Sequence, residues 1–376
     1  MSKSISRRHW FRWLVMLMLI TSAVLAGWDK WRHRHAGEMF PWKAWPRQSP
    51  EQAGFDAEKL EELSRQIGGY GCITRNGFMV FEWGHPRTPM DVGSAGKPII
   101  AHFVLKAVEA GLIPSLDSPV AQFEPELAKL NAGLGFKDKR ITWRHLLYQT
   151  ACYGQEEEPG TAFDYNDFTM NLLWRVLFTK VYKSEPKDIS QKVLNPLLAT
   201  PAGFQDGLEY LPERNGTYLG RFAISAQDFC RFGLLYMREG RWREQQLLSA
   251  SYARMAVSTP LPSKLPRTYG RHTEMIPGQL SIGTTDNQED HRGSYSCLWW
   301  INGLDINGRR LWPDAPSDTF GAFGYGGNRT MVVIPSSGIV ASWTKSDLPF
   351  VVMSGEGREQ VNRALRLLMN CVIPSK

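Results

Sequence analysis

Apolar residues recur at helical spacing in three segments of the chain, residues 49–67, 94–111 and 357–372. Each segment gathers its apolar side chains on one helical face, which predicts an amphipathic helix packed against other structure. Ser49-Pro50-Glu51 is typical of a capped helix start, and Gly111 favours the end of the second helix. The three faces are Leu60, Leu63 and Ile67; Ile99, Ile100, Phe103, Val104, Ala107 and Val108; and Val361, Leu365, Leu368 and Met369.

Strand patterns lie toward the two ends of the chain. Residues 70–83 hold two apolar runs joined by Asn76-Gly77, the dipeptide most favoured in a tight hairpin. Residues 294–303 and 307–313 together predict a second hairpin. Residues 329–346 predict a third, which turns at Ser336-Ser337-Gly338.

Between these strands the pattern changes. Residues 115–255 are mostly helical patterns and loops, and residues 273–292 are polar and predict a long loop. We therefore expect an α+β fold, with an antiparallel sheet built from both chain ends, flanked by helices, and a mainly helical domain inserted between them. The expected divisions are a linker at 28–47, a sheet subdomain at 48–115 and 256–376, and a helical subdomain at 116–255.

The first 35 residues carry most of the charge. They hold seven Lys or Arg and one acidic residue, which accounts for +6 of the formal net charge of +7. Residues 1–27 join this positive start to an apolar stretch and a small-residue exit near Ala26, which predicts a cleaved signal peptide. "SRRHWFR" resembles a twin-arginine export signal. The alternative is an uncleaved N-terminal anchor, and both predict a body exported to the bacterial envelope, in the periplasm or facing it.

The charge and the cysteine content indicate which classes of ligand and partner are not expected. The remaining charge of about +1 forms no basic stripe, so the sequence gives no reason to expect nucleic acid. Five scattered cysteines form no Cys-x-x-Cys or Cys/His cluster, so we expect no zinc site and mostly small buried thiols, at least one of them unpaired. No motif implies a metal, a nucleotide or another cofactor, and we expect membrane contact only through the N-terminal segment. The oligomeric state stays open.

"DVGSAGKPII", residues 91–100, places Ser94 and Lys97 three positions apart at the start of an apolar helix. On a helix this spacing brings the two side chains together, where a neutral amine can take the hydroxyl proton. The helix start and burial both disfavour a protonated lysine. The alternative is an N-cap serine followed by a solvated lysine. Pro98 is compatible with either only in the first helical turn.

Two other segments offer partners for a serine nucleophile. Tyr165, between a Pro-Gly turn and an apolar helical run, could move a proton beside a neutral amine, or could be an ordinary packed tyrosine. "GAFGYGGNRTMVVIP" is a glycine-dense turn that enters a strand. There a backbone N–H of Gly327 or Asn328 could form an oxyanion hole with that of Ser94, or the glycines could serve only a hairpin.

"SAGK", "DYND" and "GYGG", in this order, resemble the three motifs of the serine β-lactamase-like superfamily. "ITWRHLLYQTACYG", "EAGLIPSLDSPVAQFEPEL" and "RFAISAQDFCRFGLLYMREGRW" resemble segments around those motifs, so the likeness spans about residues 48–370. The branch it resembles holds class C β-lactamases, esterases and 6-aminohexanoate-dimer hydrolases. The resemblance implies a β-lactamase/transpeptidase-like fold.

The resemblance also implies roles for individual residues. Ser94 would be the acylating nucleophile, Lys97 its base partner and Tyr165 the second proton-transfer group, with Gly326, Gly327 and Asn328 at the oxyanion and substrate side. His145 matches a structural position and is not expected to be catalytic. No Gly-x-Ser-x-Gly elbow occurs, which disfavours the α/β-hydrolase form of serine catalysis.

Two positions depart from the family pattern. Asp167 stands where the second motif has Asn or Ser; it could pair with Lys97 and hold it protonated, or bind a cationic group of the substrate. Tyr325 stands where β-lactamases have a lysine or histidine that binds the substrate carboxylate. Arg329 is near in sequence but on an unknown side of the strand. Trp299, Trp300 and Tyr325 would suit an aromatic rim, with sheet packing as the alternative for the tryptophans.

These observations predict an exported serine hydrolase of carboxylesterase or amidase type that works through an acyl-enzyme on a small ester or amide. One alternative is a catalytically weak envelope protein that kept the fold for binding or regulation. Another is DD-peptidase, D-aminopeptidase or β-lactamase activity.

Overall fold

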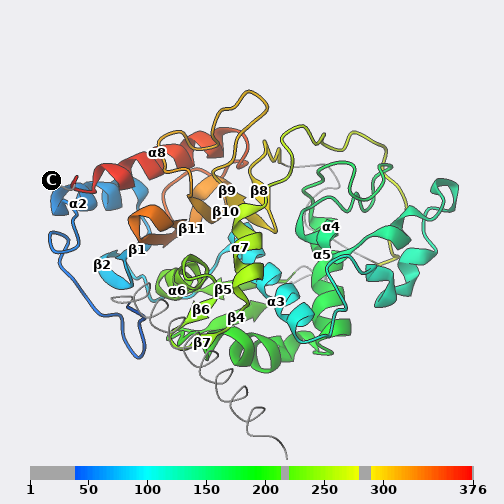
Figure 1. The fold of residues 1–376 in the computed structure, drawn as a ribbon, viewed down its shortest axis with the longest axis horizontal. Coiled ribbons are helices and arrows are strands. Elements are labelled where there is room, and N and C mark those ends of the chain that lie inside the picture. Colours follow the sequence, from blue (N-terminus) through cyan, green and yellow to red (C-terminus); the bar gives the residue numbers. More distant parts are fainter. Residues whose placement is uncertain (1–38, 213–219, 279–288, 375–376) are drawn as a thin grey trace, which may run out of the picture. The chain divides into compact units, whose positions relative to one another are not determined.

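A seven-stranded antiparallel sheet organises the protein (Figure 1). It is seen in a computed structural model that describes residues 39–212, 220–278 and 289–374. The strand order is β2-β1-β12-β11-β10-β9-β8, so strands from both ends of the sequence lie side by side, as expected. Its strands are β1 (Tyr70–Arg75), β2 (Phe78–Trp83), β8 (Tyr295–Ser296), β9 (Trp299–Ile301), β10 (Phe320–Gly324), β11 (Arg329–Ile334) and β12 (Ile339–Thr344).

Helices cover this sheet, as Figure 1 shows for α2 and α8 along one side and α6 along the other. The fold is therefore the α+β class that the sequence predicts. Alpha-helices among the described residues are α2 (Ala57–Ile67), α3 (Lys97–Glu109), α4 (Trp143–Leu147), α5 (Asp167–Arg175), α6 (Ala226–Met237), α7 (Ala250–Ser258) and α8 (Glu356–Asn370). Wider π-type turns follow α5 at Val176–Val181 and recur at Ser190–Ala199.

Short strands also occur outside the predicted hairpins, and most of them lie in the middle segment where the sequence predicts helices and loops. β3 (Met90–Asp91), β5 (Arg221–Ile224) and β4 (Leu208–Leu211) form a small sheet in that order, and β6 (Arg241–Trp242) pairs with β7 (Gln245–Gln246). α6, also from this middle segment, packs against β1, β11 and β12 of the large sheet. The small sheet matters for function because β3 leads directly into the Ser94 turn.

Turn chemistry fixes two of the predicted hairpins. Asn76 and Gly77 both have positive φ, at 52° and 89°, in the tight turn between β1 and β2. Gly338 has φ 65° and ends the turn between β11 and β12. A Cβ at Gly338 would lie 2.0 Å from the Asn76 side chain, so this residue must lack one. Both hairpin predictions are confirmed.

Two local predictions are wrong. Residues 50–54 form turns, and the helix starts after Asp56, whose side chain accepts the N–H of Lys59. Asp56 is thus the N-cap of this helix, since its carboxylate accepts a backbone N–H of the first turn. The second hairpin lies wholly within residues 294–303 as β8 and β9, while residues 307–313 contribute one isolated bridge, Leu304 to Arg310. The strand that β9 pairs with next is β10, in the segment expected as a glycine turn.

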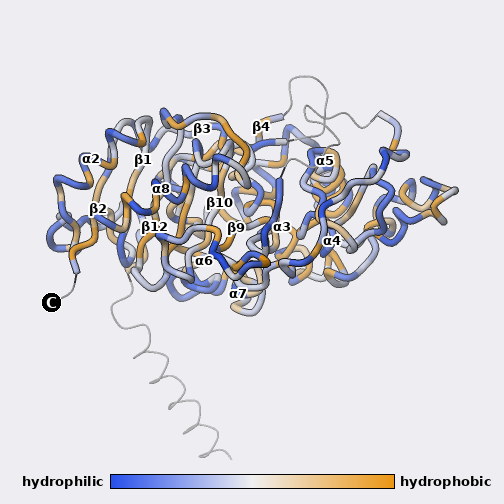
Figure 2. The backbone as a smooth tube through the Cα atoms, turned by 90° about the horizontal axis from the view of Figure 1, so that it is seen from above, coloured by the Kyte–Doolittle hydropathy of each residue, from blue (hydrophilic) through white to orange (hydrophobic). Residues whose placement is uncertain are grey.

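The interior is apolar and continuous. Every residue of β10 and β12 is buried, and the strands of the large sheet are mostly orange to white in Figure 2. On α8, Val361, Leu365 and Leu368 are buried, as the stripe predicts. All five cysteines are buried with free thiols, Cys72 and Cys230 having their Sγ atoms 3.6 Å apart.

The chain divides into two units, Met1–Met39 and Phe40–Lys376, and the sheets and helices described above all lie in the second. The predicted leader at 1–27, much of the linker at 28–47 and part of the polar loop at 273–292 lie outside the described residues. Within the described residues no helix is both long and apolar enough to span a membrane. The expected boundary between sheet and helical subdomains stays a prediction.

Candidate active site

Ser94 lies in a tight 3₁₀ turn, Gly93–Gly96, that connects β3 to α3. The carboxylate of Asp91 accepts the N–H of Gly93 at 2.8 Å and holds the start of the turn. Gly93 has φ 53°, and a Cβ there would lie 3.0 Å from both the Tyr325 ring and the Arg329 guanidinium. Pro98 falls in the first turn of α3, where its missing N–H costs no helical hydrogen bond. The local sequence thus places Ser94 at the head of a buried helix.

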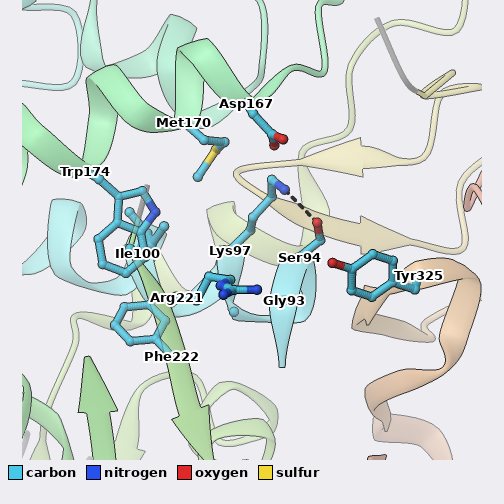
Figure 3. Close-up of a pocket in the computed structure, with 12 residues that line it drawn as sticks. Gly93, Ser94, Lys97, Ile100, Asp167, Met170, Trp174, Arg221, Phe222 and Tyr325 are labelled. Carbon is cyan, nitrogen blue, oxygen red and sulfur yellow. Dashed lines mark hydrogen bonds between the residues drawn. The ribbon is translucent and has the colours of Figure 1, made fainter. Parts of the chain in front are cut away.

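The Lys97 Nζ donates a hydrogen bond to Ser94 Oγ at 2.9 Å (Figure 3). Lys97 is only 7% exposed, so the solvated lysine of the alternative interpretation is wrong. The N-cap interpretation is wrong too, since no side chain caps either the turn or α3. A buried amine bonded to a hydroxyl is the arrangement in which a lysine can remove the serine proton.

Tyr165 lies beside this pair. The Lys97 Nζ is 4.4 Å from the centroid of the Tyr165 ring, and Tyr165 is 5% exposed. Its ring packs edge-on against Tyr295, with centroids 5.9 Å apart. The next residue, Asn166, caps α5 by accepting the N–H of Thr169 at 2.7 Å. This cap positions Tyr165 before the helix and Asp167 at its first residue.

A cavity of about 120 Å³ opens next to Ser94 and Lys97. One face of α5 forms a wall of it, because Asp167, Met170 and Trp174 follow the helical spacing i, i+3, i+7. Ile100 of α3 and Phe222 of β5 complete the apolar end, where the Trp174 and Phe222 rings lie 4.7 Å apart (Figure 3). The pocket is therefore polar near Ser94 and apolar further in.

Charges on the pocket walls are unevenly paired. Arg221 Nη1 lies 2.9 Å from the Asp91 carboxylate, and Arg329 Nη1 lies 4.0 Å from the same group. Asp167 faces the pocket from the α5 side, and Figure 3 marks one hydrogen bond among the residues it draws, from Lys97 to Ser94. No ion pair joins the two described residues Asp167 and Lys97, so the structure does not support the first of the two roles left open for Asp167, a pair with Lys97.

Tyr325 closes the other side of the pocket. Its hydroxyl is turned toward Ser94 in Figure 3, and 43% of the residue is exposed. Its ring packs edge-on against Phe350 at 4.9 Å and lies over the Arg329 guanidinium at 4.9 Å. The preceding residue, Gly324, brings backbone against the serine turn: a Cβ there would be 2.8 Å from the Val92 carbonyl and 3.5 Å from the Ser94 nitrogen.

A family model described as "Beta-lactamase" matches residues 57–361. The chain belongs to the β-lactamase family. Among solved structures, a putative 6-aminohexanoate-dimer hydrolase from Bacillus anthracis aligns with a TM-score of 0.59 and 14% identity, over 90% of each chain. A putative β-lactamase from Bacteroides dorei DSM 17855 aligns at 0.58 and 16%, over 83% of this chain and 99% of that one. EstCE1, a hydrolase with promiscuous acyltransferase activity, aligns at 0.56 and 15%, over 84% and 99%.

At these identities the solved structures show the fold, which is the β-lactamase/transpeptidase-like fold that the three motifs imply. No curated protein sequence gives a significant match. Membership of the β-lactamase family makes a serine hydrolase the general expectation for this site.

The β-lactamase-family site differs from the sequence prediction at the third motif. Gly326, Gly327 and Asn328 do not line the pocket. Their turn faces α8: the Gln360 side chain donates to the Gly326 carbonyl, and a Cβ on Gly327 would lie 2.6 Å from Val361. Asn328 N–H donates to the Tyr325 carbonyl, and its amide donates to two further carbonyls. The backbone that approaches Ser94 is that of Gly324 instead.

Three other expectations concern aromatic and imidazole side chains. Trp299 and Trp300 are buried and do not line the pocket: Trp299 stacks on Phe232, with centroids 5.7 Å apart, and Trp300 packs on Tyr295. Only Tyr325 of the expected rim is present. His145 completes a capping box with Thr142 in α4, which matches the structural position expected for it.

Several site residues were missed because no local pattern marks them. Arg221 and Trp174 reach the pocket from β5 and α5, and Asp91 acts through the backbone of the serine turn. Glu289 lies close enough to Lys97 to feel its charge. Burial raises the pKa of Glu289, while the N–H groups of Met353 and Ser354 and the charge of Lys97 oppose that rise. Glu289 lies near the end of the polar segment 273–292, and nothing in the local sequence marks it as a residue of the site.

Metal ligands do not gather here. Across residues 39–212, 220–278 and 289–374, no three His, Cys, Asp or Glu side chains form a cluster suited to a metal ion.

Proposed function

We propose that this protein is a serine hydrolase of small esters or amides that works through an acyl-enzyme on Ser94. The observation that carries the proposal is the hydrogen bond from the buried Lys97 amine to Ser94 Oγ, at the edge of a cavity. A serine alone is a weak nucleophile and needs an adjacent base. Membership of the β-lactamase family supports the same reaction type.

The proposed cycle has two acyl transfers. Ser94 Oγ bonds to the substrate carbonyl carbon while Lys97 Nζ accepts the hydroxyl proton. The bond from that carbon to the leaving oxygen or nitrogen then breaks, and the proton reaches the leaving group through Lys97 and Tyr165. Water attacks the acyl-enzyme, gives up a proton along the same route and releases the acid and the free serine. Between steps, the backbone N–H of Ser94 and the Gly324–Tyr325 backbone would hold the oxyanion.

Neutral esters or amides suit the third motif better than β-lactams do. Tyr325 brings a hydroxyl toward Ser94 but no charge for a substrate carboxylate, and the Arg221 guanidinium is already paired with Asp91. Among the structural neighbours, one is described as a putative 6-aminohexanoate-dimer hydrolase and another as a hydrolase with acyltransferase activity. These descriptions favour an amide or ester screen over a penicillin screen.

The test is the intact mass of the protein after treatment with a fluorophosphonate, beside the Ser94→Ala variant. A single adduct on the wild type and none on the variant is expected. No adduct on the folded wild type would favour a binding or regulatory protein that kept the fold. Stable labelling by a fluorescent penicillin would favour a DD-peptidase or D-aminopeptidase, whereas hydrolysis of the penicillin without stable labelling would favour a β-lactamase.

We also propose that the body acts outside the cytoplasm, because residues 1–27 have the pattern of an export signal. Expression of the full chain in a Gram-negative host, followed by fractionation and N-terminal sequencing, tests this. Periplasmic protein that begins near Gly27 is expected for a cleaved signal, and full-length protein in the inner membrane for an anchor. Full-length protein confined to the cytoplasm would contradict the proposal.

A further inference from the structure

Asp167 places a carboxylate on the pocket wall beside the proposed nucleophile. It is the first residue of α5, and its neighbour Asn166 turns inward as the cap, which leaves Asp167 facing the cavity in Figure 3. The nearest cationic side chain in that view, Lys97, donates to Ser94 rather than to Asp167. A carboxylate accepts hydrogen bonds and donates none, so its partner must be a donor or a cation.

The same helix face continues the pocket with groups that suit an alkylammonium. Met170 and Trp174 follow Asp167 at i+3 and i+7 and line the cavity. Trp174 is fixed in place by Phe178, Tyr210 and Phe222, whose ring centroids lie 4.7 to 5.5 Å from its own. Indole rings and thioethers both pack well against the methyl or methylene groups of an ammonium.

The remaining charges around the pocket do not supply that cation. Arg221 lines the opposite wall and is paired with Asp91, which also faces Arg329. Glu289 is another carboxylate that the charge of Lys97 reaches. An ammonium bound at Asp167 would therefore supply a positive charge that neither arginine brings to this wall of the pocket.

We propose that Asp167 selects substrates with an alkylammonium group, held between its carboxylate and the Met170–Trp174 wall, while their ester or amide carbonyl reaches Ser94. This rests on the proposed hydrolase function and names its substrate class. It chooses the second of the two roles that the sequence leaves open for Asp167.

Matched substrate pairs test the charge alone. One pair is the p-nitrophenyl ester of trimethylammoniobutanoate and its isostere with a tert-butyl group in place of the ammonium. The other is acetylthiocholine and the thioacetate in which a tert-butyl group replaces its trimethylammonium group. The cation therefore lies in the acyl group of the first pair and in the leaving group of the second. In at least one pair, kcat/KM should favour the cation by about tenfold, as for one partly buried charge contact. Raising the salt concentration should reduce the ratio.

The same ratio of kcat/KM, cationic over neutral substrate, is then measured for variants of Asp167 and for a control. Asp167→Asn, which keeps the shape, should reduce the preference to about twofold or less, whereas Asp167→Glu should keep most of it. Asp188→Asn removes a partly exposed carboxylate that is paired with Lys192 and does not line the pocket, so it should leave the ratio unchanged. Absence of a cation preference in both pairs, or its survival in Asp167→Asn, would overturn the proposal.

Binding without turnover separates this proposal from the hydrolase itself. Calorimetric titration of the Ser94→Ala variant with butyltrimethylammonium needs no catalysis. Binding that is weakened about tenfold by adding Asp167→Asn supports the site even if no ester is cleaved. Equal or absent binding in both proteins overturns it even if Ser94 is acylated.

Discussion

Two lysines are buried among the residues that the structure describes, and they have opposite surroundings. Lys137 is fully buried, donates to the Cys152 carbonyl at 2.8 Å and lies 3.3 Å from the carboxylate of Asp138. Asp138 in turn accepts from the Asn131 amide at 2.6 Å. Lys97 is almost as buried, but its hydrogen bond goes to a hydroxyl and it faces a cavity.

The comparison indicates how the surroundings of a structural lysine differ from those of the lysine that we propose as a base. Lys137 has a carboxylate and a carbonyl within reach, so its charge is compensated and has no reason to move. Lys97 contacts the Ser94 hydroxyl and the face of the Tyr165 ring instead. A buried amine without direct compensation can exchange its proton with a neighbour, and this is the property that a base requires.

Lys97→Met should have the largest effect on activity. It keeps the buried volume and removes the amine, so kcat/KM for an ester substrate should fall by about a thousandfold or more. The melting temperature should change little, because no ion pair is broken. Steady-state kinetics and thermal melts measure both, and a variant that retains a tenth of the activity would remove Lys97 from the mechanism.

Lys137→Met should do the reverse. It leaves the Asp138 carboxylate buried without its cation, which should lower the free energy of unfolding by about 3–5 kcal/mol. Urea denaturation measures this loss. Adding Asp138→Asn to the same protein should recover a large part of it, since no charge is then left unpaired, and kcat/KM of the folded fraction should stay within about fivefold of wild type. Loss of activity without loss of stability would contradict the structural role.

The polar cluster around Lys137 should also make stability depend on pH. Burial raises the pKa of Asp164 to about 7, against the opposing effects of hydrogen bonds from Thr268 and Asn166 and the charge of Lys137. Because the folded-state pKa lies above the unfolded value, the native state favours the neutral acid. Stability from this group is therefore complete below the unfolded pKa and is lost as pH rises through about 7.

Urea midpoints at about pH 5 and about pH 8 measure that loss. Between them the wild type should lose roughly 3 kcal/mol relative to Asp164→Asn, which cannot ionise at this position. Parallel pH dependence in the two proteins would show that Asp164 does not titrate in this range.

The Ser94–Lys97 pair could be predicted from local spacing, because the two residues are three positions apart at a helix start and do hydrogen bond. Tyr165 is distant in sequence, and its place beside Lys97 follows only from the resemblance of its motif to the family. Arg221 and Trp174 line the pocket from β5 and α5, which are far from Ser94 in the sequence, and no local pattern encodes that approach. The sequence predicts Gly327 or Asn328 at the oxyanion side because the glycine-dense run there resembles the third motif of the family.

That run is in fact the end of one strand and a turn with separate partners. β10 extends to Gly324, and its last residue abuts the serine turn, whereas Gly326 and Gly327 meet α8. The prediction and the structure differ in which glycine of this run packs against the serine turn. The sequence shows where the glycines are, but it does not show where the strand ends or in which direction the chain continues.

Substitution of Gly324 should give the smallest effect of the four and tests this assignment directly. A Cβ in Gly324→Ala would lie 2.8 Å from the Val92 carbonyl and 3.3 Å from the Ala95 nitrogen, both backbone atoms of the serine turn. The turn must shift, and with it the Ser94 N–H and the Lys97–Ser94 hydrogen bond. Displacements of this size cost catalysis steeply, so kcat/KM should fall about tenfold to a hundredfold.

Gly133→Ala is the matched control, because a Cβ there meets nothing within 4 Å. It should change neither kcat/KM nor the melting temperature appreciably. Fluorophosphonate labelling rates, measured on both variants, report on Ser94 without depending on a substrate. If Gly324→Ala labels as fast as Gly133→Ala, then the end of β10 does not support the serine turn, and the oxyanion site must be formed by other backbone groups.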